Sequence, residues 1–142
     1  MKKPKTRNHG TQTEAAFLGW IKSLLRSGSQ RWRPKNEAKK LARKGKLINP
    51  KTGRECNSGV CSSCGDTFLE KELEADHIHP VIPIGKTMNL CSRKDFDPSK
   101  HVCLSEVAER MYVEIDGYQM LCNTCHKEKT SKERSMRRNN NA

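Results

Sequence analysis

Two pairs of cysteines stand in this chain with the spacing of metal ligands, Cys61-Ser-Ser-Cys64 and Cys122-Asn-Thr-Cys125. Two such pairs can hold one tetrahedral zinc ion through four thiolates, at about 2.3 Å per Zn–S bond. We therefore predict a structural zinc site made of these four residues. A zinc ion there would join two segments that are far apart in the sequence, so folding and activity should both depend on the metal.

Carboxylate and imidazole side chains lie close to these cysteines: Asp76 and His77 between the two pairs, and His126 directly after Cys125. A four-cysteine site leaves these groups free, so we predict a second site with oxygen and nitrogen ligands for a harder cation. A neutral imidazole, with an unperturbed pKa near ~6.5, can take a proton from water at neutral pH. His77 is therefore a candidate general base for hydrolysis of a phosphodiester.

His79 allows two interpretations. It lies two residues after His77 and so on the same face of the expected strand, where it could bind a phosphate or a metal ion. Pro80 follows it and ends the strand, so His79 could equally be a partly exposed loop histidine.

The net charge of +12 is unevenly distributed. Residues 1–55 hold 16 Lys and Arg against 3 acids, residues 56–126 hold 6 against 11, and residues 127–142 hold 6 against 2. An acidic centre between basic flanks suits a metal-dependent nuclease, with carboxylates for the cation and basic residues for the phosphates. The alternative is that the basic flanks only keep the protein soluble.

At 142 residues, the chain is long enough for one domain with an arm. Only 33% of its residues are hydrophobic, so a metal ion would stabilise the compact part. No apolar run approaches the ~18 residues of a membrane span, and the basic N-terminus lacks the apolar stretch of a signal peptide. We therefore expect an intracellular, reducing compartment, in which the seven cysteines are zinc ligands rather than disulfides.

Residues 1–55 are predicted to form a basic, partly helical arm. Apolar residues at helical spacing predict a helix over residues 13–26, with Thr13 as its N-cap. A second basic helix is expected from residue 35 to 44, ended by a glycine, and residues 49–53 are typical of a turn.

The compact domain is predicted over residues 56–135, followed by a disordered basic and Asn-rich tail over residues 136–142. Its expected elements are a strand over 73–78, an insertion at about 84–116 that includes a helix over 104–112, a strand over 118–121, and a helix over 122–134.

Three motifs follow one another over residues 61–130: Cys61-x-x-Cys64, then Ala75-Asp76-His77-Ile78-x-Pro80, then Leu121-Cys122-x-x-Cys125-His126-x-x-Lys129-Thr130. In this order they resemble the HNH endonuclease family over about half of the chain, and the segments 31–35 and 117–122 are similar to its small phage-encoded members. The sequence departs from the family in two places. Gly117 stands where the family usually has an asparagine, and the interval before the second cysteine pair is longer than usual.

The resemblance implies an α+β fold with a small ββα-metal core, stabilised by the zinc site and preceded by the basic helical arm. It implies a metal-dependent DNA endonuclease with His77 as general base. Asp76 and His126 would hold the catalytic cation, Mg²⁺ or another divalent ion such as Mn²⁺ or Ni²⁺. A phage-encoded protein of this kind would act in the cytoplasm of a bacterial host, away from membranes, as a monomer or weak homodimer.

Six basic residues are candidates for contacts with DNA phosphates: Arg31, Arg33 and Lys35 in the arm, and Lys127, Lys129 and Arg134 on the last helix. Each could instead be an ordinary solvated residue. Trp32, between two arginines, could pack against Trp20 or stack on DNA.

Two alternatives stay open. One is a non-catalytic, zinc-stabilised DNA-binding module, although such a module has no use for Asp76, His77 and His126. The other concerns the left-over cysteines, since a second zinc site could form from Cys56, Cys91, Cys103 and His101.

Overall fold

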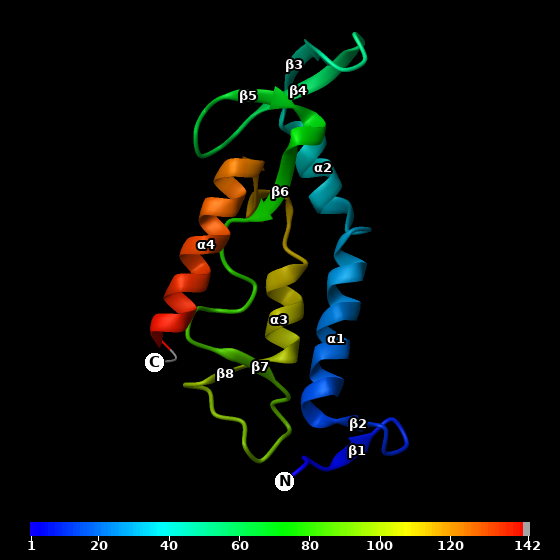
Figure 1. Ribbon diagram of the computed structural model, residues 1–142, viewed down its shortest axis with the longest axis vertical. Coiled ribbons are helices and arrows are strands. Elements are labelled where there is room, and N and C mark those ends of the chain that lie inside the picture. Colours follow the sequence, from blue (N-terminus) through cyan, green and yellow to red (C-terminus); the bar gives the residue numbers. More distant parts are fainter. Residues whose placement is uncertain (141–142) are drawn as a thin grey trace.

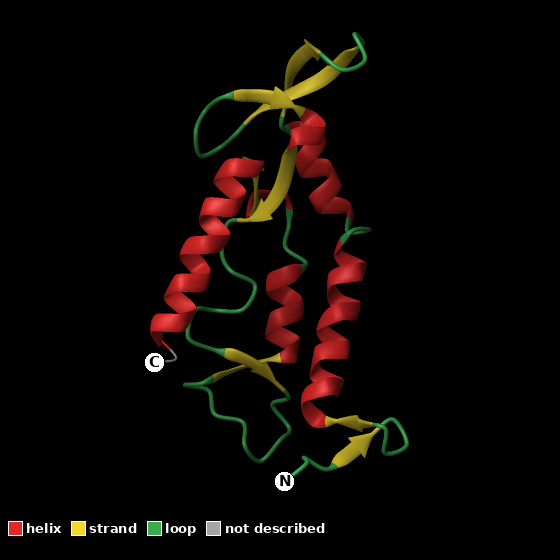
Figure 2. Ribbon diagram, in the orientation of Figure 1, coloured by secondary structure: helices red, strands yellow, loops and turns green. Residues whose placement is uncertain are grey.

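The described part of the protein, residues 1–140 of a computed structural model, contains four α-helices and several small sheets (Figures 1 and 2). The fold is therefore mixed, with both helices and strands, as predicted in outline. None of the helices in this range is both long and apolar enough to cross a membrane. The helices are α1 (Glu14–Ser29), α2 (Arg33–Leu41), α3 (Leu104–Met111) and α4 (Asn123–Asn140).

A two-stranded antiparallel sheet of β6 (Leu73–His77) and β9 (Tyr118–Cys122) lies between two helices. Both strands contact α2 and α4, and Figure 1 shows these helices on either side of β6. The strands, the intervening insertion and the following helix occur in the predicted order. The core residues at this sheet are at most 5% exposed: Cys61, Leu73, Met120, Leu121 and Cys122.

The N-terminal segment forms a short hairpin of β1 (Lys5–Arg7) and β2 (Gln12–Thr13) and then enters α1. The predicted N-cap is confirmed, because the Thr13 hydroxyl accepts a hydrogen bond from the backbone N–H of Ala16 at 3.2 Å. Helix α1 runs to Ser29, beyond its predicted end at about residue 26.

The turn predicted at residues 49–53 is confirmed, but the prediction was wrong about the segments on either side of it. A helix was expected to continue to residue 44, and the compact domain to begin at residue 56. Instead β3 (Arg43–Ile48) and β4 (Glu55–Val60) form an antiparallel hairpin across that boundary, and β5 (Thr67–Leu69) pairs with β4. Gly45 has a φ of +102° at an irregularity of the pairing, a conformation that no α-helix contains. The arm and the domain therefore share one sheet.

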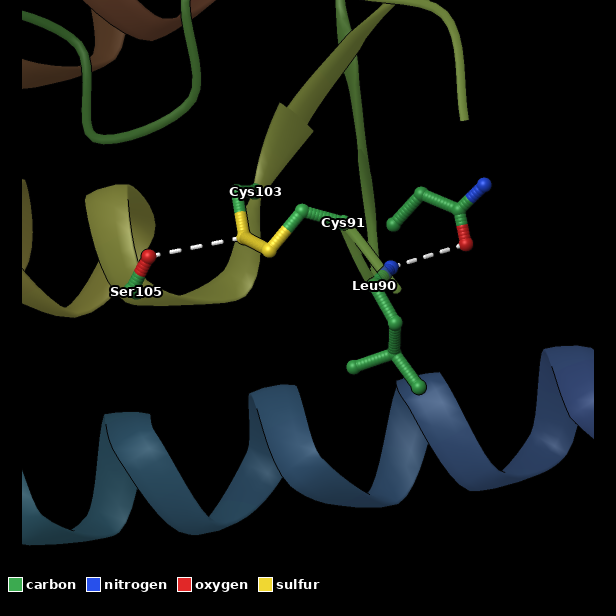
Figure 3. Close-up of a disulfide and its surroundings, with 5 residues drawn as sticks. Leu90, Cys91, Cys103 and Ser105 are labelled. Carbon is green, nitrogen blue, oxygen red and sulfur yellow. Dashed lines mark hydrogen bonds between the residues drawn. A yellow bond between two sulfur atoms is a disulfide. The ribbon is translucent and has the colours of Figure 1, made fainter. Parts of the chain in front are cut away.

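The insertion contains the parallel strands β7 (Thr87–Asn89) and β8 (His101–Cys103), followed by α3. A disulfide joins Cys91, just after β7, to Cys103 in β8, and Figure 3 shows it near Leu90, whose side chain points toward α1. The expectation of zinc ligands rather than disulfides was therefore wrong for this pair. The fold brings their Cα atoms to 5.2 Å, within the range that a disulfide spans.

Helix α4 continues to Asn140, so residues 136–140 of the predicted disordered tail are helical. Residues 141 and 142 of that tail lie outside the described residues. The side chain of Arg137 donates a hydrogen bond to the carbonyl of Ile82 at 2.7 Å, which attaches the end of the helix to the segment after β6.

Two aromatic residues attach the N-terminal helices to the rest of the fold. Trp32 packs edge-on against Tyr112, with ring centroids 5.3 Å apart, and its Nε1 donates to the Val113 carbonyl at 2.6 Å. The Tyr112 hydroxyl donates to the Leu25 carbonyl of α1 at 2.6 Å. Trp32 is thus half-buried, and its partner is Tyr112 rather than Trp20, which is 50% exposed.

Two glycines of α1 allow a matched test of this attachment. A helical Gly→Ala change stabilises by about 1 kcal/mol where space permits. Nothing lies within 4 Å of a Cβ at Gly19, whereas a Cβ at Gly28 would lie 2.5 Å from the Tyr112 hydroxyl. We expect Gly19→Ala to raise the melting temperature by about 3 °C and Gly28→Ala to lower it. Equal gains from both would mean that Tyr112 does not dock on α1.

Candidate metal and catalytic site

The four cysteines of the two CxxC pairs come together, as predicted. Cys61 and Cys64 lie in the turn between β4 and β5, Cys122 ends β9, and Cys125 lies in the first turn of α4. Their Sγ atoms all lie within 4.8 Å of one another. Four sulfurs around a tetrahedral zinc ion are about 3.8 Å apart when each Zn–S bond is ~2.3 Å. The cluster could therefore hold a metal ion such as zinc.

The chemistry of this donor set also fits a cation. Burial opposes ionisation of the Cys61 thiol, but backbone amides, foremost that of Cys122, outweigh it and lower the Cys61 pKa to about 6. The adjacent Cys122 side chain raises the pKa of Cys125 to about 12. Thiolates this close repel one another, so all four can ionise together only around a positive ion.

Asp76, at the end of β6, and His126, in the first turn of α4, are brought together. The His126 Nε2 lies 3.7 Å from the Asp76 Oδ1, and the His126 Nδ1 lies 3.5 Å from the Glu74 Oε2. Adjacent ligands of an octahedral Mg²⁺ are about 3 Å apart, so a small side-chain rotation would let Asp76 and His126 share one cation. Glu74 was not predicted. The signal was its spacing, because strand residues two apart face the same side.

Lys129 points into the site rather than away from it. Its ammonium group contacts Asp76 Oδ2, donates to the His77 carbonyl at 2.6 Å, and lies 3.4 Å from Glu133 Oε1. The sequence suggested that Lys129 would contact a DNA phosphate. In this arrangement its ammonium group is instead engaged within the protein. It balances the charge of Asp76 and holds the last carbonyl of β6.

His77 contacts the last residue of α3. Its Nε2 lies 2.7 Å from the Met111 carbonyl oxygen, and its ring lies 5.0 Å from that of Tyr118. A carbonyl oxygen only accepts, so Nε2 must carry a proton, and in a neutral imidazole Nδ1 is then the basic nitrogen. One ring nitrogen is therefore oriented by a backbone carbonyl, as expected for a general base.

The pairing of β6 with β9 shows no bulge at Asp76 or His77. Asp76 pairs with Gln119 and His77 with Tyr118 in regular register. Alternation along the strand directs Asp76 toward α4 and His77 toward α3. Because the two residues are consecutive, their Cα atoms are only about 3.8 Å apart, and both lie at the same end of β6.

His79 lies beside His77. Both residues line a surface hollow of about 330 Å³, together with Arg110. His79 is exposed and follows the end of β6 at His77. The strand therefore ends within its predicted range of residues 73–78. Arg110 is held in place by hydrogen bonds to the carbonyls of Pro80 and Val81 at 2.6 and 3.0 Å.

A second hollow beside His77, of about 490 Å³, gathers positive charge between α1, α3 and α4. The sequence did not predict that its basic residues would gather, although Lys22 and Arg26 have an i, i+4 spacing on α1. Burial, followed by the charges of Arg26 and Arg137, lowers the pKa of Lys22, which reflects this concentration of charge. We call it the cationic hollow, and its basic residues are Lys22, Arg26, Lys86 and Arg137.

The other predicted DNA contacts lie at the surface. Within residues 1–140, none of these side chains forms an ion pair, so their charges face solvent: Arg31, Arg33, Lys35, Lys127 and Arg134. Lys35 is half-buried, and the other four are exposed.

The left-over cysteines do not form a second metal site within the described residues. Cys91 and Cys103 are bonded to each other, and the His101 Nδ1 accepts a hydrogen bond from the Asp97 amide at 2.9 Å. Cys56 lies on β4 and remains a free cysteine.

Gly117 stands where the HNH motif usually has an asparagine. No side chain fits at this position. A Cβ would lie 2.5 Å from the Val113 Cγ2. The backbone holds the loop instead, since the Ile78 amide donates to the Gly117 carbonyl and the Gly117 amide to the Glu114 carbonyl, both at 3.0 Å.

No protein-family model matches this chain, and neither a curated protein nor a solved structure matches it. Only the geometry of the site and the resemblance of its motifs therefore point to a function.

The cysteine cluster predicts a metal-dependent fold. We expect Cys61→Ser or Cys125→Ser to reduce bound zinc and to lower the melting temperature by roughly 10 °C or more, because the core around β6 and β9 loses its cross-link. Cys56→Ser is the matched control, and it should change neither quantity. Zinc content is measured by elemental analysis and stability by thermal unfolding. A cluster variant with full zinc and wild-type stability would contradict the assignment.

Proposed function

We propose that this protein is a metal-dependent DNA endonuclease of the HNH type. In this proposal the four-cysteine cluster holds a structural zinc ion, Asp76 and His126 hold a divalent cation such as Mg²⁺, Mn²⁺ or Ni²⁺, and His77 is the general base. The strand pair β6–β9 followed by α4 supports this assignment, since it has the order of a ββα-metal core. A phage origin, with action in the cytoplasm of a bacterial host, belongs to the same proposal.

The observation that carries the proposal is the pairing of Asp76 with His126 beside a His77 ring held by a backbone carbonyl. A binding module needs the cysteines and the basic surface, but it gains nothing from a carboxylate and two imidazoles at one end of a strand. Hydrolysis of a phosphodiester needs both kinds of group: ligands for a cation and a base for water.

The roles of the side chains follow from their contacts. His77 Nε2 stays on the Met111 carbonyl, so Nδ1 can take the proton of the attacking water. Asp76 offers Oδ1, because Oδ2 is engaged by Lys129. The bound cation would neutralise the scissile phosphate and stabilise the departing oxygen. The cationic hollow beside His77 would attract the DNA backbone.

Loss of the base should abolish cleavage without unfolding the protein. We expect His77→Ala to lower the nicking of supercoiled plasmid with Mg²⁺ or Mn²⁺ by a factor of about 10²–10⁴, the usual contribution of a general base. Zinc content and DNA affinity should stay near those of the wild type. His79→Ala, at the rim of the same hollow, is the matched control and should keep most of the activity. Unchanged nicking by folded His77→Ala would remove His77 from this role, and binding without cleavage by the wild type would favour the DNA-binding module.

Variants of two lysines on α4 distinguish assembly of the site from contact with DNA. Lys129 is engaged with Asp76, whereas Lys127 is exposed and makes no ion pair within residues 1–140. We expect Lys129→Gln to reduce nicking at saturating DNA while leaving DNA affinity within about twofold. Lys127→Gln should weaken affinity and lower the salt slope by about 0.9, the effect of one lost phosphate contact, with little effect at saturating DNA. The reverse pattern would show that Lys129 contacts the substrate.

A further inference from the structure

A basic β-hairpin projects from one end of the molecule. We call residues 43–57 the basic ribbon: β3, the turn after it and the first three residues of β4. All six residues of β3 are exposed, and Figure 1 shows the hairpin extending beyond α2 at the top of the view. The ribbon carries one acidic residue, Glu55, and five basic ones: Arg43, Lys44, Lys46, Lys51 and Arg54.

Most of this positive charge is unbalanced. Arg43 pairs with Glu70 at 3.1 Å. The other four basic side chains form no ion pair and no side-chain hydrogen bond within residues 1–140. Four unpaired charges on one projecting hairpin fit a strongly anionic partner.

The tip of the ribbon has a defined shape. Asn49 is only 5% exposed, and its Oδ1 accepts a hydrogen bond from the Lys51 amide at 2.9 Å. The Asn49 amide donates to the Arg54 carbonyl, and the Gly53 amide to the Asn49 carbonyl, both at 2.8 Å. A turn that is already ordered loses little conformational entropy on binding.

The root of the ribbon is fixed to the candidate site. Strand β4 runs directly into Cys61 of the cysteine cluster. At its inner end the backbone of Gly59 packs so closely that a Cβ there would lie 2.9 Å from Leu73 Cδ1 and 3.0 Å from the Ala42 carbonyl. Since Leu73 begins β6, the ribbon and the strand that carries Asp76 and His77 are held in one arrangement.

We propose that the basic ribbon binds duplex DNA by entering its major groove. This inference rests on the proposed function for its substrate, and it adds the form of DNA and the element that recognises it. Two paired strands lie about 4.8 Å apart, and the major groove, about 12 Å wide, admits a two-stranded ribbon. The basic side chains would then reach the phosphates on both edges of the groove, while Lys46 and Ile48, two residues apart on one strand face, would approach the base edges.

Charge removal at the two ends of the molecule tests this proposal. The ribbon variant carries Lys44→Gln, Lys46→Gln, Lys51→Gln and Arg54→Gln. The matched control carries four exposed lysines changed at the opposite end, Lys2→Gln, Lys3→Gln, Lys94→Gln and Lys100→Gln. Both are made in a His77→Ala background, so that binding is measured without cleavage. Fluorescence anisotropy follows binding to a labelled duplex and to one of its single strands, between about 50 and 200 mM salt.

We expect the ribbon variant to lose at least about tenfold in duplex affinity, and its salt slope to fall by up to about 2.7, the effect of three phosphate contacts. The control should lose less than about 1 in slope. Single-strand affinity should fall much less than duplex affinity in the ribbon variant. Circular dichroism and zinc content verify that both variants are folded.

Three results would overturn the proposal: a ribbon variant that binds duplex like the control, equal losses on duplex and single strand, or a parent protein that does not bind duplex DNA. The nuclease proposal fails separately. If the unmutated protein cuts no DNA with any cation while the ribbon variant loses duplex binding, the ribbon assignment stands alone. If the unmutated protein nicks plasmid and the ribbon variant binds like the control, only the ribbon assignment is wrong.

Discussion

The meeting of four cysteine sulfurs within 4.8 Å of one another is the constraint around which the rest of this structure is arranged. Cys61 stands at the root of the basic ribbon, and Cys122 stands where β9 becomes α4, so one metal ion would fix two things at once. It would set the direction of the ribbon relative to β9, and it would hold the first turn of α4, which faces Asp76. A chain with 33% hydrophobic residues has few other means of joining segments so far apart in sequence. Leu73, Met120 and Leu121 pack in one buried cluster with Cys61 and Cys122.

The end of α3 links the N-terminal helices to His77 through three successive residues. The Met111 carbonyl orients the His77 ring, the Tyr112 hydroxyl binds the Leu25 carbonyl of α1, and the Val113 carbonyl accepts the Trp32 indole N–H. The N-terminal helices are thus part of the structure that positions the candidate base. A view of residues 1–55 as a separable DNA-binding arm does not fit these contacts. The insertion supplies this connection at the end of its predicted helix.

Local patterns in the sequence predicted what local forces determine. Thr13 caps α1 because its hydroxyl reaches an amide three residues on, and the alternation from Leu73 to His77 indicates a strand with one side on the core. The CxxC spacing predicted the cysteine cluster because few other structures require it. The hairpin of β3 and β4 was missed, since basic residues at mixed spacing fit a helix as well as a strand until the pairing of β3 with β4, and of β4 with β5, decides. The disulfide and the inward direction of Lys129 depend on tertiary packing and have no local signature.

The division of Asp76 and His77 between the two faces of β6 restricts how a substrate could bind. A phosphate on the α4 face would meet Asp76, His126 and Lys129 but not the His77 ring, and one deep in the cationic hollow would meet only His77. Only the end of the strand, where the chain turns toward Pro80, is near both groups. A DNA backbone that crosses this end could be held by the cationic hollow on one side, while the basic ribbon, attached to the opposite end of β6, grips the duplex farther along. Under the proposed function, a duplex that spans both ends of β6 would gain contacts with the basic ribbon that a short substrate at the strand end would lack.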